Sequence, residues 1–373
     1  MITTINNKHN KLNVPNLRFP EFQGEWEKCK LGDLCNVLMC KRILASQTNT
    51  EEGVPFYKIG TIGNAPDAYI SKELFDDYKT KYNYPHKGEV MITCAGTVGK
   101  CVIYDGKDAY YQDSNIVWID NPSQCISNSF LYHLLAKVDW RKLNSTTIIR
   151  IYNDDLRNLK LSYPQIEEQQ KISRLLSFLD ERIVTQNKII DKLQSLIKGI
   201  AQKIVRNNKP NVRLAECLEC KSSTLQESEV CEQGTYPVYG ANGIVGYLDN
   251  YSTEGEAVYI IKDGSGVGTV SYVTGKCSAT GTLNTLQAKE GYSLQYLYYL
   301  LKIFNFEPYK TGMAIPHIYF KDYGKAKVFC PSYTEQLQYA RLLSAIDSEL
   351  SIEKNFLTSL SLQKQYLLRH MFI

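Results

Sequence analysis

The chain has 373 residues, of which 43% are hydrophobic and 22% are charged, and its formal net charge is +4. Its composition is that of an ordinary globular protein, and its length predicts two or three domains. No apolar run approaches the roughly 18 residues of a membrane helix, the first residues lack an apolar signal core, and eleven scattered cysteines do not indicate a disulfide framework. We therefore expect a cytoplasmic protein without membrane contact. Its charge is too small for a nucleic-acid binder that makes every phosphate contact alone.

Two bodies of short strands are predicted, each with Gly and Asn turns between the strands and one short helix. We place the first body, with an N-terminal arm, at residues 1–163 and the second at 210–330. The expected elements of the first body are strands Val90–Thr93, Val102–Tyr104 and Asn115–Ile119 and helix Ser127–Leu135. Those of the second body are strands Val258–Ile261 and Thr269–Val273 and helix Leu294–Leu301.

A long amphipathic segment follows each body, at 164–209 and at 331–373. Apolar residues alternate at spacings of three and four, which is the pattern of a coiled-coil seam. The first seam comprises Ile172, Leu176, Leu179, Ile183, Ile190, Leu193, Ile197, Ile200 and Ile204, and the second comprises Tyr339, Leu343, Ile346, Leu350, Leu357, Leu360 and Leu367. Gln186 interrupts the first seam, and Glu353 interrupts the second at the matching position, with a further break at Lys364. A buried polar residue of this kind fixes register and pairing.

The chain contains an internal repeat. Residues 164–180 and 331–347 are identical at eight of seventeen positions, at a constant offset of 167. Upstream, Ile148, Ile151, Tyr152 and Asp155 match Ile315, Ile318, Tyr319 and Asp322. We therefore predict an α+β fold with two mixed α/β bodies, separated by two long antiparallel coiled-coil helices and related by a pseudo-twofold repeat. The alternative is that each helix packs only on its own globular core.

Three catalytic-looking motifs fail on inspection. The segment AGTVGKC, which ends at Cys101, lacks the Gly and the Ser or Thr of a phosphate-binding loop. Pro66-Asp67 has no Glu-x-Lys partner of a nuclease, and Cys217-x-x-Cys220 has no second pair to complete a zinc site. We find no methyltransferase motif and no acid–base constellation, so we expect no catalytic residue, no metal and no cofactor.

What remains is a set of polar loop residues suited to reading DNA. Gln and Asn pair with adenine, Arg and Lys pair with guanine, and basic side chains and Gly turns hold phosphates. The candidates are Lys41, Arg42, Lys58, Thr97, Lys100, Tyr111, Gln112, Ser114 and Asn115 in the first body and Tyr239, Asn242, Lys262, Ser265, Thr280 and Asn284 in the second. Each loop by itself is also compatible with an ordinary polar turn.

The chain resembles the specificity subunits of type I restriction–modification systems. The resemblance is carried by the opening LRFPEFQGEW (17–26), the Pro-x-x-x-Glu-Gln helix starts at 164 and 331, and the phrases PFYKIGT (55–61), QDSNIVW (112–118) and YPVYGANGIVGY (236–247). It implies two target-recognition domains, each reading one half of a split double-stranded DNA site. It also implies helices that space these domains and dock two methyltransferase subunits, with restriction/translocase subunits completing the complex. The chain itself would catalyse nothing.

Two other functions stay open at this stage. The same chain could serve a type IIB-like or orphan methylation complex, in which it would read DNA with different partners. It could instead be a coiled-coil interaction scaffold without DNA binding, which the modest net charge favours slightly.

Overall fold

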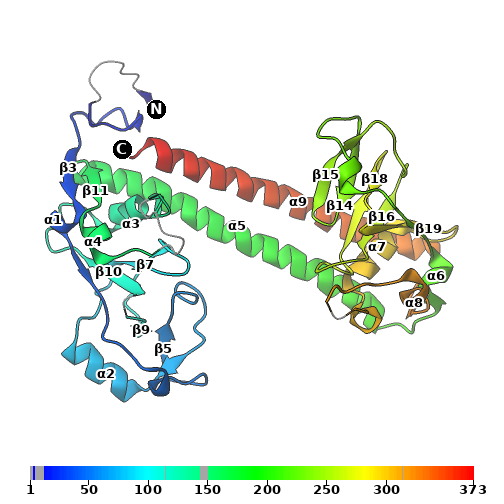
Figure 1. Cartoon of the computed structure of the whole chain (residues 1–373), viewed down its shortest axis with the longest axis horizontal. Helices are drawn as coiled ribbons and strands as arrows, with labels where there is room; N and C mark the ends of the chain where they lie inside the picture. The colour runs from blue at the N-terminus through cyan, green and yellow to red at the C-terminus, as the bar shows by residue number, and fades with distance from the viewer. Residues whose placement is uncertain (1–2, 5–11, 114, 143–149, 313) are drawn as a thin grey trace. The chain divides into compact units, whose positions relative to one another are not determined.

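The computed structural model describes residues 3–4, 12–113, 115–142, 150–312 and 314–373 (Figure 1). The chain forms two compact units, Met1–Val184 with Thr358–Ile373, and Thr185–Leu357. Each unit contains one strand-rich body and a part of two long helices, α5 (Ile166–Arg206) and α9 (Tyr333–His370). No helix in the described part of the chain is long and apolar enough to cross a membrane.

The first body is built on a four-stranded antiparallel sheet. Its order is β4 (Asn36–Leu38), β10 (Ile116–Asp120), β7 (Val90–Thr93) and β8 (Cys101–Ile103). A smaller sheet has the order β6 (Tyr69–Ile70), β5 (Val54–Tyr57) and β9 (Tyr110–Tyr111), with β5 and β9 parallel. Strand β3 (Glu27–Lys30) pairs with β11 (Lys160–Tyr163), and β1 (Thr3–Thr4) pairs with β2 (Leu17–Arg18). The helices are α1 (Leu31–Leu34), α2 (Lys72–Lys81), α3 (Asn128–Ala136), α4 (Asn153–Arg157) and the 3-10 turn η1 (Ala45–Gln47).

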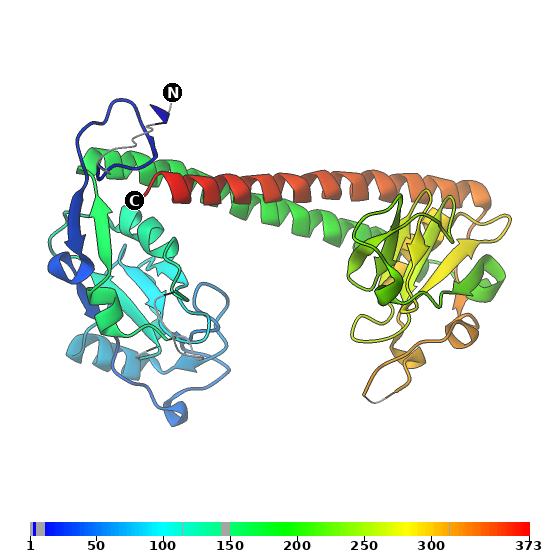
Figure 2. The same ribbon diagram turned by 45° about the horizontal axis from the view of Figure 1, so that its top comes forward.

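The second body repeats this plan (Figure 2). Its four-stranded sheet has the order β13 (Leu218–Ser222), β19 (Leu283–Ala288), β16 (Ala257–Ile261) and β17 (Val270–Val273). Its smaller sheet has the order β15 (Gly243–Leu248), β14 (Tyr236–Gly240) and β18 (Ser278–Ala279), and β14 and β18 are again parallel. Strand β12 (Val212–Arg213) pairs with β20 (Lys327–Val328). The remaining elements are α6 (Leu214–Cys217), α7 (Leu294–Ile303), α8 (Phe320–Tyr323) and the 3-10 turns η2 (Glu227–Glu229) and η3 (Glu307–Tyr309).

Strand β10 shows why the first body holds together. Successive side chains of a strand point to opposite faces, and here both faces are covered. Val117 and Ile119 lie in the core shared with the two long helices, whereas Ile116 and Trp118 lie in the core beneath the smaller sheet. A strand buried on both faces reads as a continuous apolar run. The predicted strands and short helices are accordingly confirmed to within two residues of their ends.

A buried glutamine at the start of each long helix fastens the preceding body to that helix. The Gln169 side chain accepts a hydrogen bond from the backbone amide of Ser127, the cap of α3, at 2.8 Å, and donates to the carbonyl of Pro164 at 2.8 Å. Gln336 makes the same two bonds, with the amide of Ser293, the cap of α7, and with the carbonyl of Pro331, both at 2.9 Å. The repeated Pro-x-x-x-Glu-Gln motif is therefore a structural clamp.

The glutamate of the same motif has different partners in the two halves. Glu168 forms a buried two-pronged ion pair with Arg18, at 2.7 and 2.8 Å, which attaches the N-terminal arm to α5. Glu335 is exposed and completes a capping box with Ser332, as its spacing predicts. The opening segment of the chain thus stabilises the first body by a contact that the second body replaces with a local cap.

Helices α5 and α9 pack together in both units and run antiparallel. In the first unit the beginning of α5 contributes Leu176 to a core that also contains Leu367 of α9. In the second unit the end of α5 contributes Ile197 to a core that also contains Leu343. The predicted fold class is confirmed, and the alternative of two helices on separate cores is wrong, because each core contains residues of both helices.

The polar breaks lie inside the seam, as the sequence predicts. Gln186 is buried, and its amide donates to the backbone carbonyl of Glu353 at 3.2 Å and to the Glu353 carboxylate. The second break, Lys364, pairs with Asp180 of α5. Each interruption of one helix is thus met by a polar partner on the other.

The Gln186–Glu353 pair gives a stability prediction. Gln186→Leu alone should lower the free energy of unfolding by about 1–3 kcal/mol, because the Glu353 carboxylate loses its donor beside apolar residues. The double variant Gln186→Leu with Glu353→Leu should recover this loss or exceed wild type. Urea unfolding of the full chain measures both, with the exposed Gln194→Leu as control. A single variant as stable as the double one would contradict the pairing.

A second prediction concerns His133 of α3, which is buried with its Nε2 atom 3.5 Å from the Ser177 hydroxyl. Burial lowers the pKa of His133 to about 4, below its unfolded value of about 6.5. The folded state therefore favours the neutral ring, and stability is lost as the pH falls from about 6.5 towards 4, by on the order of 3 kcal/mol in full. Unfolding midpoints at pH 7 and pH 5 should differ less in His133→Gln than in wild type. Equal differences would refute this role.

Candidate nucleic-acid interface

The turn after β7 and the turn after β16 occupy the same place in the two bodies. Gly99 has φ +83° and Gly268 has φ +90°, a region that side chains rarely adopt. A Cβ atom at Gly99 would overlap the Trp140 ring, and one at Gly268 would lie 2.9 Å from Phe306. An aromatic ring therefore packs against the glycine of each turn. This contact fixes the position of the residues at the tip of the turn.

Thr97 and the basic candidates of the first body lie on several of its loops. Thr97 is exposed at the tip of the turn after β7, and the Lys100 ammonium donates to the carbonyl of Ile62. The other basic candidates have partners as follows: Lys58 pairs with Asp67 at 3.1 Å, Arg42 pairs with Asp113 at 3.2 Å, and Lys41 lies 5.4 Å from the centre of the Tyr82 ring. Most of these cations are exposed and weakly paired, so a phosphate can displace their present partners at small cost.

The segment between β9 and β10 carries the amide candidates of the first body. Gln112 is half-buried, and its Oε1 atom is enclosed without a hydrogen-bond partner among the described residues. Asn115 is half-buried at the start of β10, and Ser114 lies outside the described residues. An amide oxygen without a partner among the described residues retains the capacity to accept a hydrogen bond.

Tyr111 does not belong in this set. It is 4% exposed and its ring stacks on Tyr57 with centroids 5.8 Å apart, and burial raises the pKa of its hydroxyl. Its side chain fills the core beneath the smaller sheet. Both residues of the two-residue strand β9, Tyr110 and Tyr111, are buried in this core, so neither ring is presented to solvent.

In the second body the exposed candidates are Asn242 and Ser265. Asn242 precedes Gly243, which has φ +109°, in the hairpin turn between β14 and β15. Lys262 is half-buried, and Tyr239 packs against Tyr259 with centroids 5.6 Å apart. Asn242 and Ser265 are exposed, so they can reach a DNA groove without rearrangement of the body.

Thr280 and Asn284 require the same correction as Tyr111. Thr280 is 1% exposed and its hydroxyl lies 2.9 Å from that of Thr282. Asn284 is 4% exposed and accepts a hydrogen bond from Ser222 at 2.8 Å across the β13–β19 pair. Both side chains are buried and bond to partners within the second body, Thr280 between β18 and β19 and Asn284 across the sheet, as polar groups in an interior must.

The candidate set missed a segment that lies beside each glycine turn. The amide of Ile151 donates to the carbonyl of Cys94 at 2.9 Å, and the amide of Ile318 donates to that of Lys262 at 3.0 Å. The residues that follow, Tyr152 and Tyr319, are 60% and 49% exposed. The repeat of 148–155 at 315–322 was a visible signal for this segment, although loop chemistry did not single it out.

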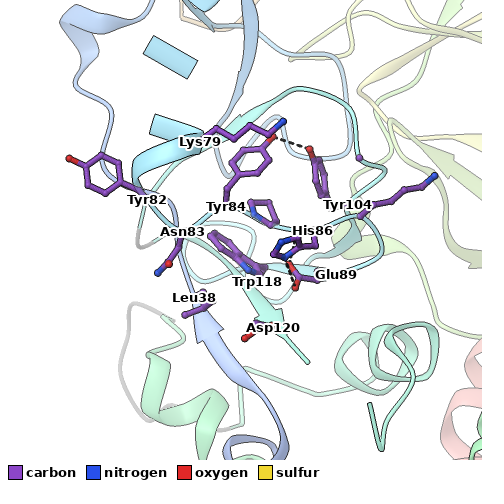
Figure 3. A pocket seen from close by; sticks show the side chains of 13 residues that line it. Leu38, Lys79, Tyr82, Asn83, Tyr84, His86, Glu89, Tyr104, Trp118 and Asp120 are labelled. Atoms are coloured by element: carbon purple, nitrogen blue, oxygen red, sulfur yellow. Dashed lines mark hydrogen bonds and ion pairs between the residues drawn. The ribbon is translucent and has the colours of Figure 1, made fainter. Parts of the chain in front are cut away.

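A cavity of about 570 Å³ opens in the first body between the end of α2 and the sheet (Figure 3). Figure 3 shows Tyr84 hydrogen-bonded to Tyr104, at 2.9 Å, and His86 beside Glu89, at 3.5 Å. Burial raises the pKa of the Glu89 carboxyl. Lys79 is engaged with Asp108 at 3.0 Å. The tyrosines and the paired charges that line this cavity bond to one another. Within the described ranges, no three His, Cys, Asp or Glu side chains are grouped to hold a metal.

The fold defines a duplicated protein in which each strand-rich body leads into one helix of an antiparallel pair. Residues 23–195 and 208–361 both match the model of the type I restriction modification DNA specificity domain. Since these matches cover most of the chain, the protein belongs to that family.

Relatives and solved structures agree with this assignment. The chain is 48% identical over 169 residues to the putative type I restriction enzyme specificity subunit S.HindORF215P of Haemophilus influenzae, covering 45% of this chain and 43% of the relative. It is 25% identical over 197 residues to the putative MjaX specificity subunit of Methanocaldococcus jannaschii, covering 49% and 46%. The matched segments thus span less than half of each relative.

Two solved structures share the fold. A type I restriction–modification S subunit from M. genitalium has a TM-score of 0.68 at 19% identity, covering 96% of this chain and 99% of that one. A chain from a study of complex assembly and conformational transition of the type I R-M system has a TM-score of 0.51 at 16% identity, covering 93% and 97%.

The amide segment gives a test of the interface. Gln112→Ala should weaken DNA binding or relax its sequence preference by about 1–3 kcal/mol, the discrimination of one bidentate contact. Competition binding with the cognate duplex and with duplexes altered at single base pairs measures this. The buried Tyr111→Phe serves as control and should leave recognition unchanged. Wild-type recognition by the Gln112→Ala variant would show that this segment is an ordinary turn without a role in recognition.

Proposed function

We propose that this chain is the non-catalytic specificity subunit of a type I restriction–modification complex. It reads a split site in double-stranded DNA, one half with each body, and docks two methyltransferase subunits and the restriction/translocase subunits. In this proposal the bodies at 1–163 and 210–330 are target-recognition domains, and the helical segments at 164–209 and 331–373 are the spacers that carry them. The complex acts in the cytoplasm.

The observation that carries the proposal is which residues are identical in the two copies of the repeat and which differ. The positions kept in both copies are mainly structural: the clamp glutamines Gln169 and Gln336 and seam residues such as Leu176 and Leu343. The loop tips differ: the glycine turn ends in Lys100 in the first half and in Thr269 in the second. A constant frame with different tips is what reading two unlike half-sites requires, because base edges are read by side-chain chemistry.

Duplicated surface residues on the helices support two copies of one partner. Arg174 of α5 and Arg341 of α9 are identical in the repeat and both exposed. The leucine that follows each arginine is also repeated, and Leu342 is 50% exposed. Leu175 packs against the core of the first unit, so the side chains that the two surfaces expose are the arginines and Leu342. Two equal surfaces suit two equal subunits, which we take to be the methyltransferases.

The chemistry belongs to the partners in this proposal. A methyltransferase must extrude its target base from the stack and place it beside a methyl donor. The present chain holds the enzyme at the site by binding the flanking sequences. The exposed Asn242 and the exposed cations suit recognition. The side chains of His317 and Asp263, 2.6 Å apart, join two segments within the second body.

Exchange of one body tests the proposal. Replacing residues 210–330 by the corresponding body of a relative should change one half of the methylated motif and leave the other half as it was. Sequencing of methylated bases in cells that carry the chain and its neighbouring methyltransferase gene measures both halves together. Deletion of the chain should abolish the motif.

The outcomes separate the alternatives. A change in both halves would overturn one-body, one-half-site reading. A methylated motif without DNA cleavage would assign the chain to an orphan or type IIB-like methylation complex. No motif at all, from a complex that still assembles, would favour the scaffold.

A further inference from the structure

Tyr152 and Tyr319 are identical residues at equivalent positions, and packing does not explain why both halves keep them. The residue before each, Ile151 or Ile318, is 2% or 1% exposed and belongs to the core. The tyrosines are 60% and 49% exposed. Within the described part of the chain, neither phenol hydroxyl has a hydrogen-bond partner. A large side chain retained on the surface in both halves indicates an external contact.

A cation lies over each of these rings. The guanidinium of Arg150 is 5.9 Å from the centre of the Tyr152 ring, and the ammonium of Lys321 is 5.2 Å from that of Tyr319. The cation precedes the tyrosine in the first half and follows it in the second. The two halves therefore place a positive charge over the tyrosine ring with different residues. This pairing suits an anion such as a phosphate.

The carboxylates nearby are each occupied by a partner. Asp155 accepts from the amide of Tyr152 at 2.8 Å, and Asp154 pairs with Arg157 at 3.2 Å. Beside Tyr319, Asp322 pairs with Lys325 at 3.9 Å. Asp263, on the neighbouring turn, pairs with His317 at 2.6 Å. Each of these acids therefore has a partner other than Arg150 or Lys321.

The backbone places each tyrosine next to a loop already assigned to DNA. The Ile151 amide binds the glycine turn that carries Thr97, and the Ile318 amide binds the glycine turn that carries Ser265. Both of these hydroxyl residues are exposed at the tips of their turns. The tyrosine, the cation and the turn thus form one surface in each half.

We propose that Tyr152 and Tyr319 each donate a hydrogen bond to a DNA phosphate, with Arg150 and Lys321 neutralising its charge. The inference rests on the proposed function and deepens it. The two bodies meet different bases but the same sugar–phosphate backbone, and phosphate contacts position a protein without carrying sequence information. Features that remain the same in two otherwise divergent readers are therefore assigned to the backbone.

The test uses the full chain bound to its methyltransferase subunits, with Tyr152→Phe, Tyr319→Phe and the double variant. Affinity is measured on the cognate duplex and on a scrambled duplex of the same composition. Each single variant should weaken binding to both duplexes by the same factor, about 2- to 10-fold, the value of one hydrogen bond. The methylated motif should not change.

Salt dependence adds a readout that a merely structural role would not move. Arg150→Gln or Lys321→Gln should each reduce the slope of log affinity against log salt by about 0.9, the loss of one phosphate contact. Tyr251→Phe is the matched control. It is an exposed tyrosine with Lys276 at 4.7 Å from its ring, but its hydroxyl donates to Glu254 and it lies outside the repeated segment. Its affinity and slope should equal those of wild type.

Three outcomes would overturn the phosphate contact. They are wild-type affinity in both Phe variants, a loss confined to the cognate duplex, and release of the methyltransferase subunits with residual DNA affinity unchanged. The last would make the surface a protein contact. A wild-type complex that bound neither duplex would instead overturn the proposed function, so the two failures are distinguishable.

Discussion

The buried glutamine at the start of each long helix is the contact on which the rest of the structure depends. Gln169 is fully buried and bonds to the capped end of α3, to the carbonyl of Cys125 and to the carbonyl of Pro164. A buried amide that lost these partners would cost about 1–3 kcal/mol for each unsatisfied group. The bond network therefore fixes where a body ends and how its short helix meets the long one. Gln336 repeats this in the second unit, so the loops of both bodies are mounted on the same joint.

This glutamine contact belongs to the part of each body that stays the same, whereas the loop tips differ between the two bodies. The frame has to stay constant, and the four-stranded sheets, the parallel pairing in the smaller sheets and the glycine turns recur in both bodies. The tips have to differ if two unlike half-sites are read. Rigid mounting of Gly99 on Trp140 and of Gly268 on Phe306 allows the tip residues to change without disturbing the turn. The modest net charge fits this arrangement, because the phosphate contacts are shared with partner subunits in the proposed complex.

The polar residues in the helix seam lower its stability but define its register. Gln186 meets Glu353, and Lys364 meets Asp180. Leucine at the three seam positions, Gln186, Glu353 and Lys364, would bury more apolar surface. Polar pairs of this kind disfavour sliding, since a shifted alignment would leave each group against apolar neighbours. A defined register matters in the proposed function because the two helices carry the bodies to which DNA reading is assigned there.

The sequence by itself determined the repeat, both seams with their polar breaks, the strands near Val90 and Val258 and the family, because these depend on spacing along the chain and on residue identity. It also pointed to exposed turn residues such as Thr97 and Asn242. Only the tertiary structure decided that Tyr111, Thr280 and Asn284 face inward, that the motif glutamines are clamps, and that Tyr152 and Tyr319 stand exposed beside the glycine turns. The physical reason is that a polar or aromatic side chain in a short strand is equally compatible with either face of the sheet. Its side is chosen by what packs against it from elsewhere in the chain.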